Sequence, residues 1–593
     1  MKRKTIKKIA SLLALTITAT SVLVGCGKKD DKPASVPDGG QVSGTESKQE
    51  SESSEEVKVE KKGSIKVMIY DRASIPNSEG DMTNNRWTDW IRENAPVENI
   101  EFVPIPKAEG YETMNLQFLS GTGPDFYPNT ESRLTEFVTQ GMAAEITDEM
   151  LDKMPNYKKI LEDYPIMVKG NTKNGKLYGL GMYKNWCYNH TMIVREDWME
   201  NLGLEAPETA EDLYDILYAF TYNDPDGNGV NDTWGINLTA DGQRVLSHMF
   251  GFGNPEKYKF DENGNFVYAW ENIEAWLTFC KRIVADKLVN PDYATMKGDD
   301  DQADFFSGKI GIWCSGRMGD YNSRWNTLKE SLPDAKFTSF ALPDGGFGKY
   351  TAYGAGIETR GFISSDAKDL DATLAYVNWL YDPAVADYLY YGEEGVYNAR
   401  NEYGTWATVD VERSKIESDY KLQDYCLITS IFMPDSAIAA GYSPRANDDY
   451  NKSLSTDDTI RQEHGIFNYK LYTITSDPNV TDPRVYLTQG KPNVPEEMAV
   501  SFTTADSMIN DILKAGISEA NKTAAEVVAE AKSVWEAAGG AEIDAWYADF
   551  YMNDPNALLP SDFLSLKIVP EMTPIARENA LALGFNPDEW TID

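Results

Sequence analysis

The chain has 593 residues, of which 41% are hydrophobic and 25% are charged, and its formal net charge is −38. This length is enough for more than one hydrophobic core, so we expect two or three lobes. An acidic surface repels phosphate backbones, which argues against a nucleic-acid partner, and it also disfavours a polyanionic ligand unless a local basic pocket exists.

The N-terminus has the pattern of a secretory signal. Five of the first eight residues are basic and none is acidic, and an apolar run from 9 to 24 leads into Gly25-Cys26. The run is shorter than the ~20 residues that span a bilayer. A Cys directly after the small residue resembles the bacterial lipobox, in which that thiol is diacylated and becomes the first residue of the mature chain. We therefore predict cleavage after Gly25 and a lipid anchor of the palmitate type on Cys26, and the alternative is an uncleaved anchor helix.

A polar segment follows the predicted anchor. Residues 27–62 are mostly Lys, Asp, Ser, Glu, Gly and Pro, and they cannot bury enough apolar surface to offset the entropy of ordering. We predict a disordered tether here. Two acyl chains hold a protein stably at a membrane, so the predicted location is the extracellular face of the cell membrane.

The folded part begins with a strand, a helix and a second strand. The alternating segment 64–70 and the short segment 101–105 are predicted strands, and 87–93 is a predicted helix between them. This order favours a βαβ unit in an open α/β sheet, where ligands bind outside the carboxyl ends of the strands. Tyr70 and Asp71 lie at such an end and are candidate ligand contacts. Alternatively, Tyr70 caps the core and Asp71 caps a turn.

The loop after the second strand resembles a known family. The segment 118–121 would end a helix at Ser-Gly, and Pro124-Asp125-Phe126 would open a short strand, because Pro124 disfavours the α region at Gly123. Family 1 extracellular solute-binding proteins have a similar loop. The resemblance implies that Asp125 faces the ligand cleft.

Further stretches up to about residue 400 are similar to elements of the same family. They are Lys176–Gly181 with the strand-like segment 188–194, Phe305–Trp313, Tyr353–Ile357 and Gly392–Tyr397. Gly181 replaces the usual proline of the first crossover. The resemblance implies an α/β fold of the two-lobe, periplasmic-binding-protein-like type II, with hinge crossovers. Such proteins close on a ligand and deliver it to the permease subunits of an ABC transporter.

The predicted domain organisation follows from these elements. The boundaries are 1–25 for the signal peptide, 26–62 for the lipidated Cys and tether, 63–182 and 355–440 for the first lobe, 183–354 for the second lobe, and 441–593 for an α-rich C-terminal segment that packs on the lobes. The resemblance covers little of the last segment, where 521–538 is a predicted amphipathic helix.

An oligosaccharide is the predicted ligand. Sugars bind to flat aromatic faces and to planar polar groups, and the candidates stand at predicted crossovers or strand ends. The stacking candidates are Trp186, Trp313 and Tyr353, and the polar candidates are Asp125, Arg317 and Glu393.

Residues 224–233 form the segment with the most specific chemistry. Oxygen side chains alternate at Asp224, Asp226 and Asn228, Gly229 allows a sharp turn, and Val230 (through its carbonyl) and Asp232 complete the first nine positions of an EF-hand-type loop. The twelfth position is Gly235 instead of Glu. We predict a structural Ca²⁺ here, and the alternative is an Asx-rich turn without metal. Large oligosaccharide-binding members of the family have a similar loop.

Two helices are predicted from apolar spacing. One is capped by Thr209 and has Leu213, Ile216, Leu217 and Phe220 on one face. The other, within 272–286, buries Cys280.

Local motifs of common enzymes are absent from the sequence. Only three His occur, and there is no HExxH, GxSxG, GxGxxG, phosphate-binding loop or CxxC pair. We therefore predict a binding protein and not an enzyme. The alternatives are a surface glycoside hydrolase, whose carboxylate pair leaves no local motif, a peptide-binding transporter lipoprotein and a structural surface protein.

Overall fold

The computed structural model describes most of the chain from residue 60 onward. The residues outside this description are 1–59, 108–109, 130–132, 182–190, 254–256, 297–299, 316–321, 349–359, 401–405, 411, 414–415, 418–424, 426–453, 455–457, 477–491, 493, 560–561, 563–573 and 587–593.

Five strands form the first sheet, in the order β2-β1-β3-β13-β6. They are β1 (Ser64–Asp71), β2 (Asn99–Pro106), β3 (Phe126–Asn129), β6 (Gly179–Gly181) and β13 (Arg360–Ile363). Strand β1 is parallel to β2 and β3, whereas β13 is antiparallel to β3 and β6. Helix α1 (Arg86–Asn94) connects β1 to β2, so the predicted βαβ unit is confirmed.

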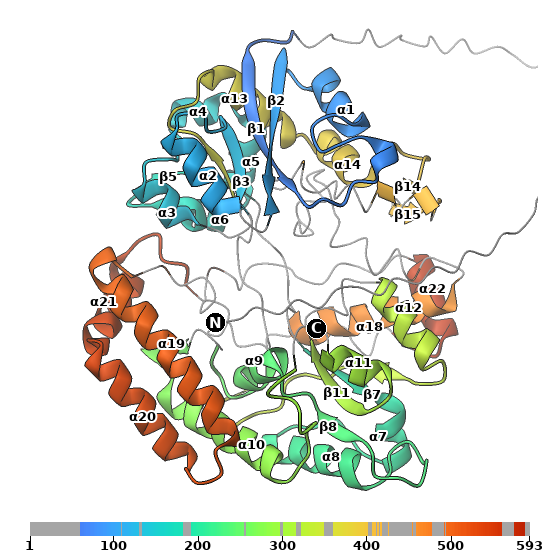
Figure 1. The fold of residues 1–593 in the computed structure, drawn as a ribbon. Helices are drawn as coiled ribbons and strands as arrows, with labels where there is room; N and C mark the ends of the chain where they lie inside the picture. Colours follow the sequence, from blue (N-terminus) through green and yellow to red (C-terminus); the bar gives the residue numbers. More distant parts are fainter. Residues whose placement is uncertain are drawn as a thin grey trace, which may run out of the picture. The chain divides into compact units, whose positions relative to one another are not determined.

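Both faces of the first sheet are covered by helices (Figure 1). Along β1, Ile65, Val67 and Ile69 join a buried cluster with side chains of α1 and of α13 (Leu370–Leu380). Met68 and Tyr70 join a second cluster with side chains of α2 (Gly110–Leu119) and α3 (Leu134–Thr139). Parallel strands are typically buried on both faces in this way.

The remaining elements of this part of the chain are short. They are the 3₁₀ helix η1 (Asn77–Glu79), α4 (Asp148–Asp152), α5 (Pro155–Asp163), α6 (Pro165–Asn171), the paired strands β4 (Thr172–Lys173) and β5 (Lys176–Leu177), α14 (Pro383–Tyr391), and the paired strands β14 (Asn398–Arg400) and β15 (Trp406–Thr408).

Four strands form the second sheet, in the order β12-β7-β11-β8. They are β7 (Thr191–Arg195), β8 (Trp234–Ile236), β11 (Ile310–Ser315) and β12 (Phe337–Thr338). Strand β7 is antiparallel to β11 and β12, and β8 is parallel to β11. The other elements here are α7 (Glu196–Leu202), α9 (Ala240–Met249), α11 (Asp300–Phe306), α12 (Asn322–Ser331), and the hairpin of β9 (Tyr258–Phe260) and β10 (Phe266–Tyr268).

Helix α8 (Ala210–Tyr222) packs against the second sheet with the predicted face. Its four apolar side chains at 213, 216, 217 and 220 are all buried. Thr209 and Asp212 form a complete capping box, because each side chain accepts a hydrogen bond from the backbone N–H of the other. Helix α10 (Trp270–Ala285) likewise buries Cys280 as predicted.

Among the described strands, the chain passes from one sheet to the other twice. It leaves the first sheet after β6, enters the second at β7, and returns to the first at β13. This connectivity agrees with the predicted two-lobe α/β fold. The proposed lobe boundaries at 182 and 354 fall outside the described residues, so they remain predictions.

The C-terminal part is α-rich, as predicted. It contains α18 (Thr459–Ser476), α19 (Glu496–Ser518), α20 (Ala524–Ala537), α21 (Gly540–Asn553) and α22 (Pro574–Ala582). Helices α19 and α20 pack on α10, and α21 packs on β10, whereas α18 packs on α12 and β12.

Candidate functional site

The carboxyl edge of the first sheet is the place where its parallel strands end. These ends are Asp71, Pro106 and Asn129, and the antiparallel β13 begins there at Arg360, opposite Asn129 and Gly181. Ligands of open α/β sheets bind outside this edge. The first crossover also starts there, after Gly181.

Asp71 lies at this edge and its neighbour Tyr70 lies in the core. The Asp71 side chain is half-buried, and its Oδ1 accepts a hydrogen bond of 2.8 Å from the backbone N–H of Ala73. Tyr70 is only 1% exposed, and the Nζ of Lys107 lies 4.2 Å from the centre of its ring. The candidate contact at Tyr70 is therefore corrected to a core position, and Asp71 caps a turn through Ala73, both as the alternative interpretation stated.

Asp125 does not reach the ligand edge. It precedes β3, which runs parallel to β1 with Phe126 opposite Val67, so Asp125 lies at the amino end of the sheet. It is 4% exposed, and its two carboxylate oxygens accept hydrogen bonds of 2.7 Å from the backbone N–H groups of Lys66 and Lys368. The expected role in the cleft is wrong, because this side chain ties the sheet to the segment before α13.

Trp313 is also a core residue. It lies on β11, where the sequence predicts a strand, but it is 2% exposed. Its ring stacks on Phe305 at 5.3 Å and meets Phe306 edge-on at 5.9 Å. Both neighbours come from α11, so the ring has no free face for a sugar, and the predicted stacking role is corrected.

Arg360 is a residue at the carboxyl edge that the sequence pattern did not single out. Its guanidinium donates to Asn171 Oδ1 at 3.1 Å and to the carbonyl oxygen of Gly170 at 2.8 Å. These contacts fix the start of β13 against the end of α6, next to the second crossover. Its place directly after the Tyr353–Ile357 crossover was the available sequence signal.

A polar network at one end of the second sheet was missed as well. Asn237 follows β8, and its amide donates to Asp301 Oδ2 at 2.7 Å and to the carbonyl oxygen of Cys314 at 3.2 Å, while its Oδ1 accepts from the Cys314 N–H at 2.7 Å. Thr239 also donates to Asp301, at 2.5 Å. Burial, with Asp241 and Asp301 nearby, raises the pKa of the Cys314 thiol, which stays protonated. The network therefore lies where β8 and β11 both end.

Four sequence candidates for ligand contact remain to be placed. Glu393 is exposed in the turn after α14. Trp186, Arg317 and Tyr353 lie outside the described residues, as does the lipidation candidate Cys26.

The segment 224–233 forms a loop that is tied together by its own side chains. Asp224 Oδ2 accepts from the Gly229 N–H at 3.0 Å, and the Asn228 amide donates to Asp226 Oδ2 at 2.8 Å and to Asp232 Oδ1 at 3.3 Å. Lys309 forms an ion pair with Asp232 and, with Asn228, holds the pKa of that carboxyl below its usual range. Among the described residues, Asp224 Oδ1 is buried without a hydrogen-bond partner.

Two features are absent from the described part of the chain. Within those ranges, no group of three or more His, Cys, Asp or Glu side chains is arranged to hold a metal ion. The helices within them include none with the length and apolar character needed to cross a membrane.

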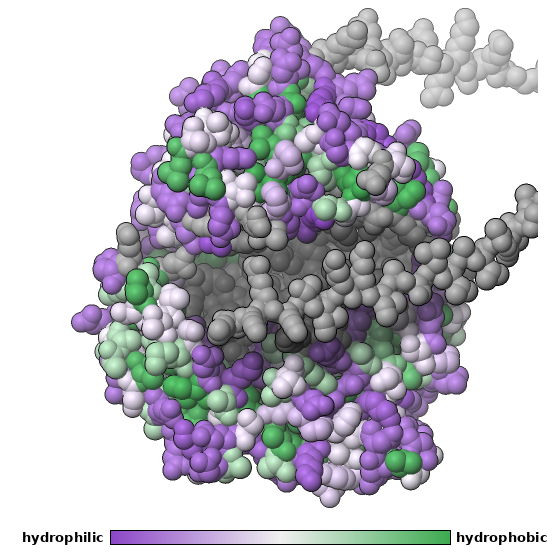
Figure 2. All heavy atoms as spheres, in the orientation of Figure 1, coloured by the Kyte–Doolittle hydropathy of each residue, from purple (hydrophilic) through white to green (hydrophobic). Residues whose placement is uncertain are grey.

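Hydrophilic residues dominate the described part of the face shown in Figure 2. Hydrophobic residues appear there in separate small groups. The view agrees with a chain that carries 94 acidic and 56 basic residues.

A family model described as bacterial extracellular solute-binding protein matches residues 88–387, about half of the chain. The chain belongs to this family.

Three curated relatives are similar over part of their length. Lipoprotein LipO of Bacillus subtilis is 30% identical over 247 residues, which cover 40% of this chain and 47% of LipO. The polygalacturonan/rhamnogalacturonan-binding protein YtcQ of the same species is 25% identical over 332 residues, covering 53% and 64%. FusA of Streptococcus pneumoniae, a fructooligosaccharide ABC transporter substrate-binding protein, is 27% identical over 312 residues, covering 49% and 54%. The matches therefore span about half to two thirds of these relatives.

Solved structures share the fold over more of the chain. An extracellular solute-binding protein from Bifidobacterium longum subsp. infantis matches with a TM-score of 0.65 and 18% identity, covering 84% of this chain and 99% of that one. A FusA EF-hand mutant in complex with fructo-nystose matches with a TM-score of 0.59 and 17% identity, covering 83% and 99%.

Proposed function

We propose that this protein is lipid-anchored at the extracellular face of the cell membrane, where it captures an oligosaccharide and delivers it to the permease subunits of an ABC transporter. The observation that carries the proposal is the double crossover between two sheets in a chain of the solute-binding family. The names of YtcQ and FusA support a carbohydrate ligand. The sequence contains none of the common local enzyme motifs, so it gives no support to catalytic turnover of the sugar.

The proposed mechanism is closure of two lobes on the sugar. A ligand shifts the equilibrium between the open and closed forms by its difference in affinity for the two forms. Asp71 and Glu393 offer carboxylate acceptors from the first lobe, and we assign Trp186 and Tyr353 to stacking and Arg317 to hydrogen bonding. Arg360 and the Asn237–Asp301 network act as positioning groups, because their polar atoms already bond to protein neighbours.

Calorimetry combined with small-angle scattering tests this function on the full-length chain. We expect fructo-nystose or an oligogalacturonate to bind with measurable heat and to reduce the radius of gyration. Asp71→Ala should weaken binding by about tenfold, as expected for one lost hydrogen bond to a charged group. Asp371→Ala is the matched control, because that carboxylate is 79% exposed on α13 and pairs only with Lys153 among the described contacts.

Two outcomes would contradict the function. Silent calorimetry together with unchanged scattering across a broad panel of neutral and acidic oligosaccharides would exclude sugar capture. Release of smaller saccharides from a bound oligosaccharide would instead establish the glycoside hydrolase alternative.

The proposed anchor has its own test. Metabolic labelling with a radioactive fatty acid should mark the chain, and Cys26→Ser should abolish the label and release the protein into the medium. A Cys26→Ser variant that stays at the membrane and keeps its label would contradict the lipobox interpretation.

We also propose that the 224–233 loop binds a structural Ca²⁺. Asp224, Asp226 and Asp232 offer carboxylate oxygens, the hard ligands that Ca²⁺ prefers. The Val230 carbonyl and the Asn228 side-chain oxygen would complete the set of ligands. The buried, unpartnered Asp224 Oδ1 fits this donor set. The Asn228 amide now donates to two carboxylates, so binding requires it to turn its oxygen inward. When bound, the ion would offset the mutual repulsion of three carboxylates.

Chelation tests the calcium proposal. EDTA should lower the melting temperature of the full-length chain, and added Ca²⁺ should restore it. Asp226→Asn should lose most of this response, whereas Asp261→Asn, in the turn of the β9–β10 hairpin, should keep it. Equal melting temperatures with EDTA and with Ca²⁺ would favour the metal-free Asx turn.

A further inference from the structure

The start of β11 places a lysine beside the end of the 224–233 loop. The loop leads directly into β8, and β8 pairs in parallel with β11, with Trp234 opposite Ile310. The backbone N–H of Trp234 donates to the carbonyl oxygen of Lys309 at 2.8 Å. Parallel strands that pair at their first residues begin side by side, so the register of the sheet fixes the backbone of Lys309 next to the loop.

The ammonium group of Lys309 forms an ion pair with Asp232 Oδ2. The two side chains are 39% and 37% exposed. The other carboxylate oxygen of Asp232 accepts from the Asn228 amide at 3.3 Å, and the same amide donates to Asp226 Oδ2 at 2.8 Å. An ammonium and an amide therefore already occupy carboxylate oxygens that a metal ion in this loop would use.

Lys309 is the basic side chain that balances the charge of the loop. The loop has three carboxylates, on Asp224, Asp226 and Asp232, and among the described ion pairs only Lys309 contacts any of them. A positive charge beside carboxylates reduces their mutual repulsion, as a bound cation would. The same positive charge repels a second cation, so it opposes the binding of a divalent ion in the loop.

The twelfth position of the loop increases the importance of this ion pair. Gly235 stands there, where an EF-hand loop has a bidentate Glu. A cation in this loop would therefore depend more on its remaining carboxylates, one of which is Asp232. For the ion to reach Asp232 Oδ2, the partly exposed side chain of Lys309 has to turn away.

We propose that Lys309 is a built-in competitor of Ca²⁺ at the 224–233 loop, which stabilises the loop without the ion and lowers the affinity for it. The inference rests on the calcium proposal above and adds the residue that sets the affinity. Extracellular calcium modules bind the ion with a Kd of roughly 0.1–1 mM, and we expect the wild-type loop to lie in this range. Its occupancy would then follow the calcium concentration outside the cell.

Calorimetric titration of CaCl₂ into the full-length chain, after EDTA treatment and dialysis, tests the competition. Lys309→Met removes the charge and keeps most of the apolar stem. We expect it to bind Ca²⁺ about tenfold more tightly, because a positive charge next to the divalent ion has been removed. Lys309→Gln should act in the same way, whereas Lys309→Arg should keep the wild-type affinity. Asp226→Asn identifies the heat that belongs to this loop by its loss.

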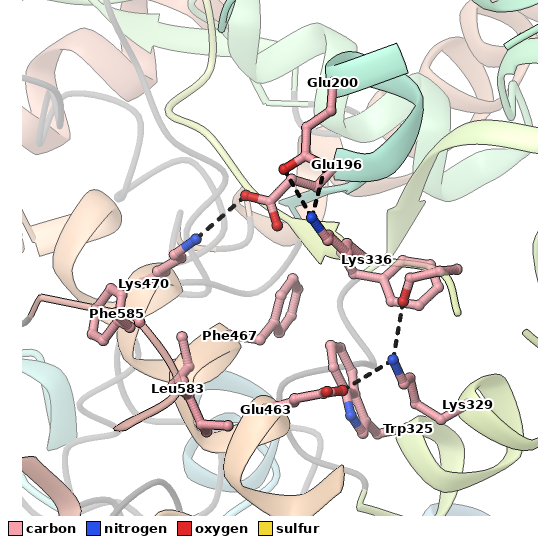
Figure 3. A pocket seen from close by; sticks show the side chains of 14 residues that line it. Glu196, Glu200, Trp325, Lys329, Lys336, Glu463, Phe467, Lys470, Leu583 and Phe585 are labelled. Atoms are coloured by element: carbon pink, nitrogen blue, oxygen red, sulfur yellow. Dashed lines mark hydrogen bonds and ion pairs between the residues drawn. The ribbon is translucent and has the colours of Figure 1, made fainter. Parts of the chain in front are cut away.

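Melting temperatures test the stabilising role of the same side chain. In EDTA, Lys309→Met should melt at a lower temperature than the wild type, and Ca²⁺ should raise its melting temperature by more. Lys336→Met is the matched control, with a calcium response equal to that of the wild type. Lys336 precedes β12 of the same sheet and pairs with Glu200 at 2.7 Å. This pair lies in the wall of the cavity around Trp325, which has about 430 Å³ and no lining residue from the loop (Figure 3).

The outcomes separate this inference from the calcium proposal. Equal Ca²⁺ affinities of the wild type and Lys309→Met would overturn the competition and leave the calcium loop in place. Weaker binding by Lys309→Met would also overturn it, and would show that Lys309 holds Asp232 ready for the ion. A melting temperature of Lys309→Met in EDTA that matches the wild type would refute the stabilising role. Calcium binding by neither protein would overturn the calcium proposal together with this inference.

Discussion

The role of a carboxylate beside a strand depends on whether it lies at the start or at the end of that strand. Asp125 and Asp71 are both carboxylates next to a strand, but Asp125 precedes β3 whereas Asp71 ends β1. In a parallel sheet these positions are at opposite edges, so Asp125 bonds to backbone, whereas Asp71 lies at the carboxyl edge, outside which open α/β sheets bind their ligands. Strand direction also explains Arg360, which begins β13 but lies at the same edge as Asp71 because β13 is antiparallel to β3.

Asp125→Ala should destabilise the fold and leave ligand affinity unchanged. Removing the carboxylate leaves the N–H groups of Lys66 and Lys368 without their acceptor, which we expect to cost about 2–3 kcal/mol in the free energy of unfolding. Urea denaturation measures this loss. Asp371→Ala, at an exposed ion pair, should change little. An Asp125→Ala variant that keeps its free energy of unfolding but no longer binds sugar would instead show that Asp125 contacts the ligand in the cleft.

At the scale of elements, the C-terminal helices are held to the second part of the chain by buried polar contacts within an aromatic cluster. Asp544 of α21 accepts from the Tyr258 hydroxyl at 2.9 Å and from Trp535 Nε1 at 3.1 Å. Lys257, 1% exposed, pairs with Asp506 of α19 at 2.7 Å. These contacts join the β9–β10 hairpin to three helices that the family resemblance did not cover.

The docking of α21 should depend on pH through Asp544. Burial raises the pKa of this carboxyl, so the folded chain holds the proton more tightly than the unfolded chain. Its contribution to stability is therefore fully present below the ordinary carboxyl pKa and is lost as the pH rises through the raised value. We expect the stability difference between wild type and Asp544→Asn to be largest at acidic pH and to shrink toward neutrality.

Urea denaturation of both proteins across the acidic range measures that difference, in which the shared titrations of other groups cancel. A difference that grows with pH would show that the hydrogen bonds from Tyr258 and Trp535 outweigh burial and lower the pKa of Asp544.

At the scale of the whole molecule, charge restricts the ligand. The net charge of −38 would become about −43 after removal of the five basic residues of the predicted signal peptide. Such a surface repels anionic oligosaccharides at long range, and salt screens this repulsion within about 10 Å at 0.1 M.

Salt should therefore separate acidic from neutral ligands. We expect the affinity for an oligogalacturonate to rise between low salt and about 0.5 M NaCl, while that for fructo-nystose stays constant. Calorimetry at both salt concentrations measures this. An oligogalacturonate affinity that falls with salt would indicate a local basic pocket that overrides the net charge.

The sequence by itself determined the βαβ start, the buried faces of α8 and α10 and the α-rich C-terminus, because apolar periodicity and caps are local properties, and the two-lobe class followed from the resemblance to a known family. Only the tertiary structure decided that Tyr70, Asp125 and Trp313 are interior, since burial depends on which helices cover both faces of a sheet. The network of Asn237, Asp301 and Cys314 and the cavity around Trp325 also required it. Their members are far apart in the chain, and no local pattern encodes a contact between distant elements.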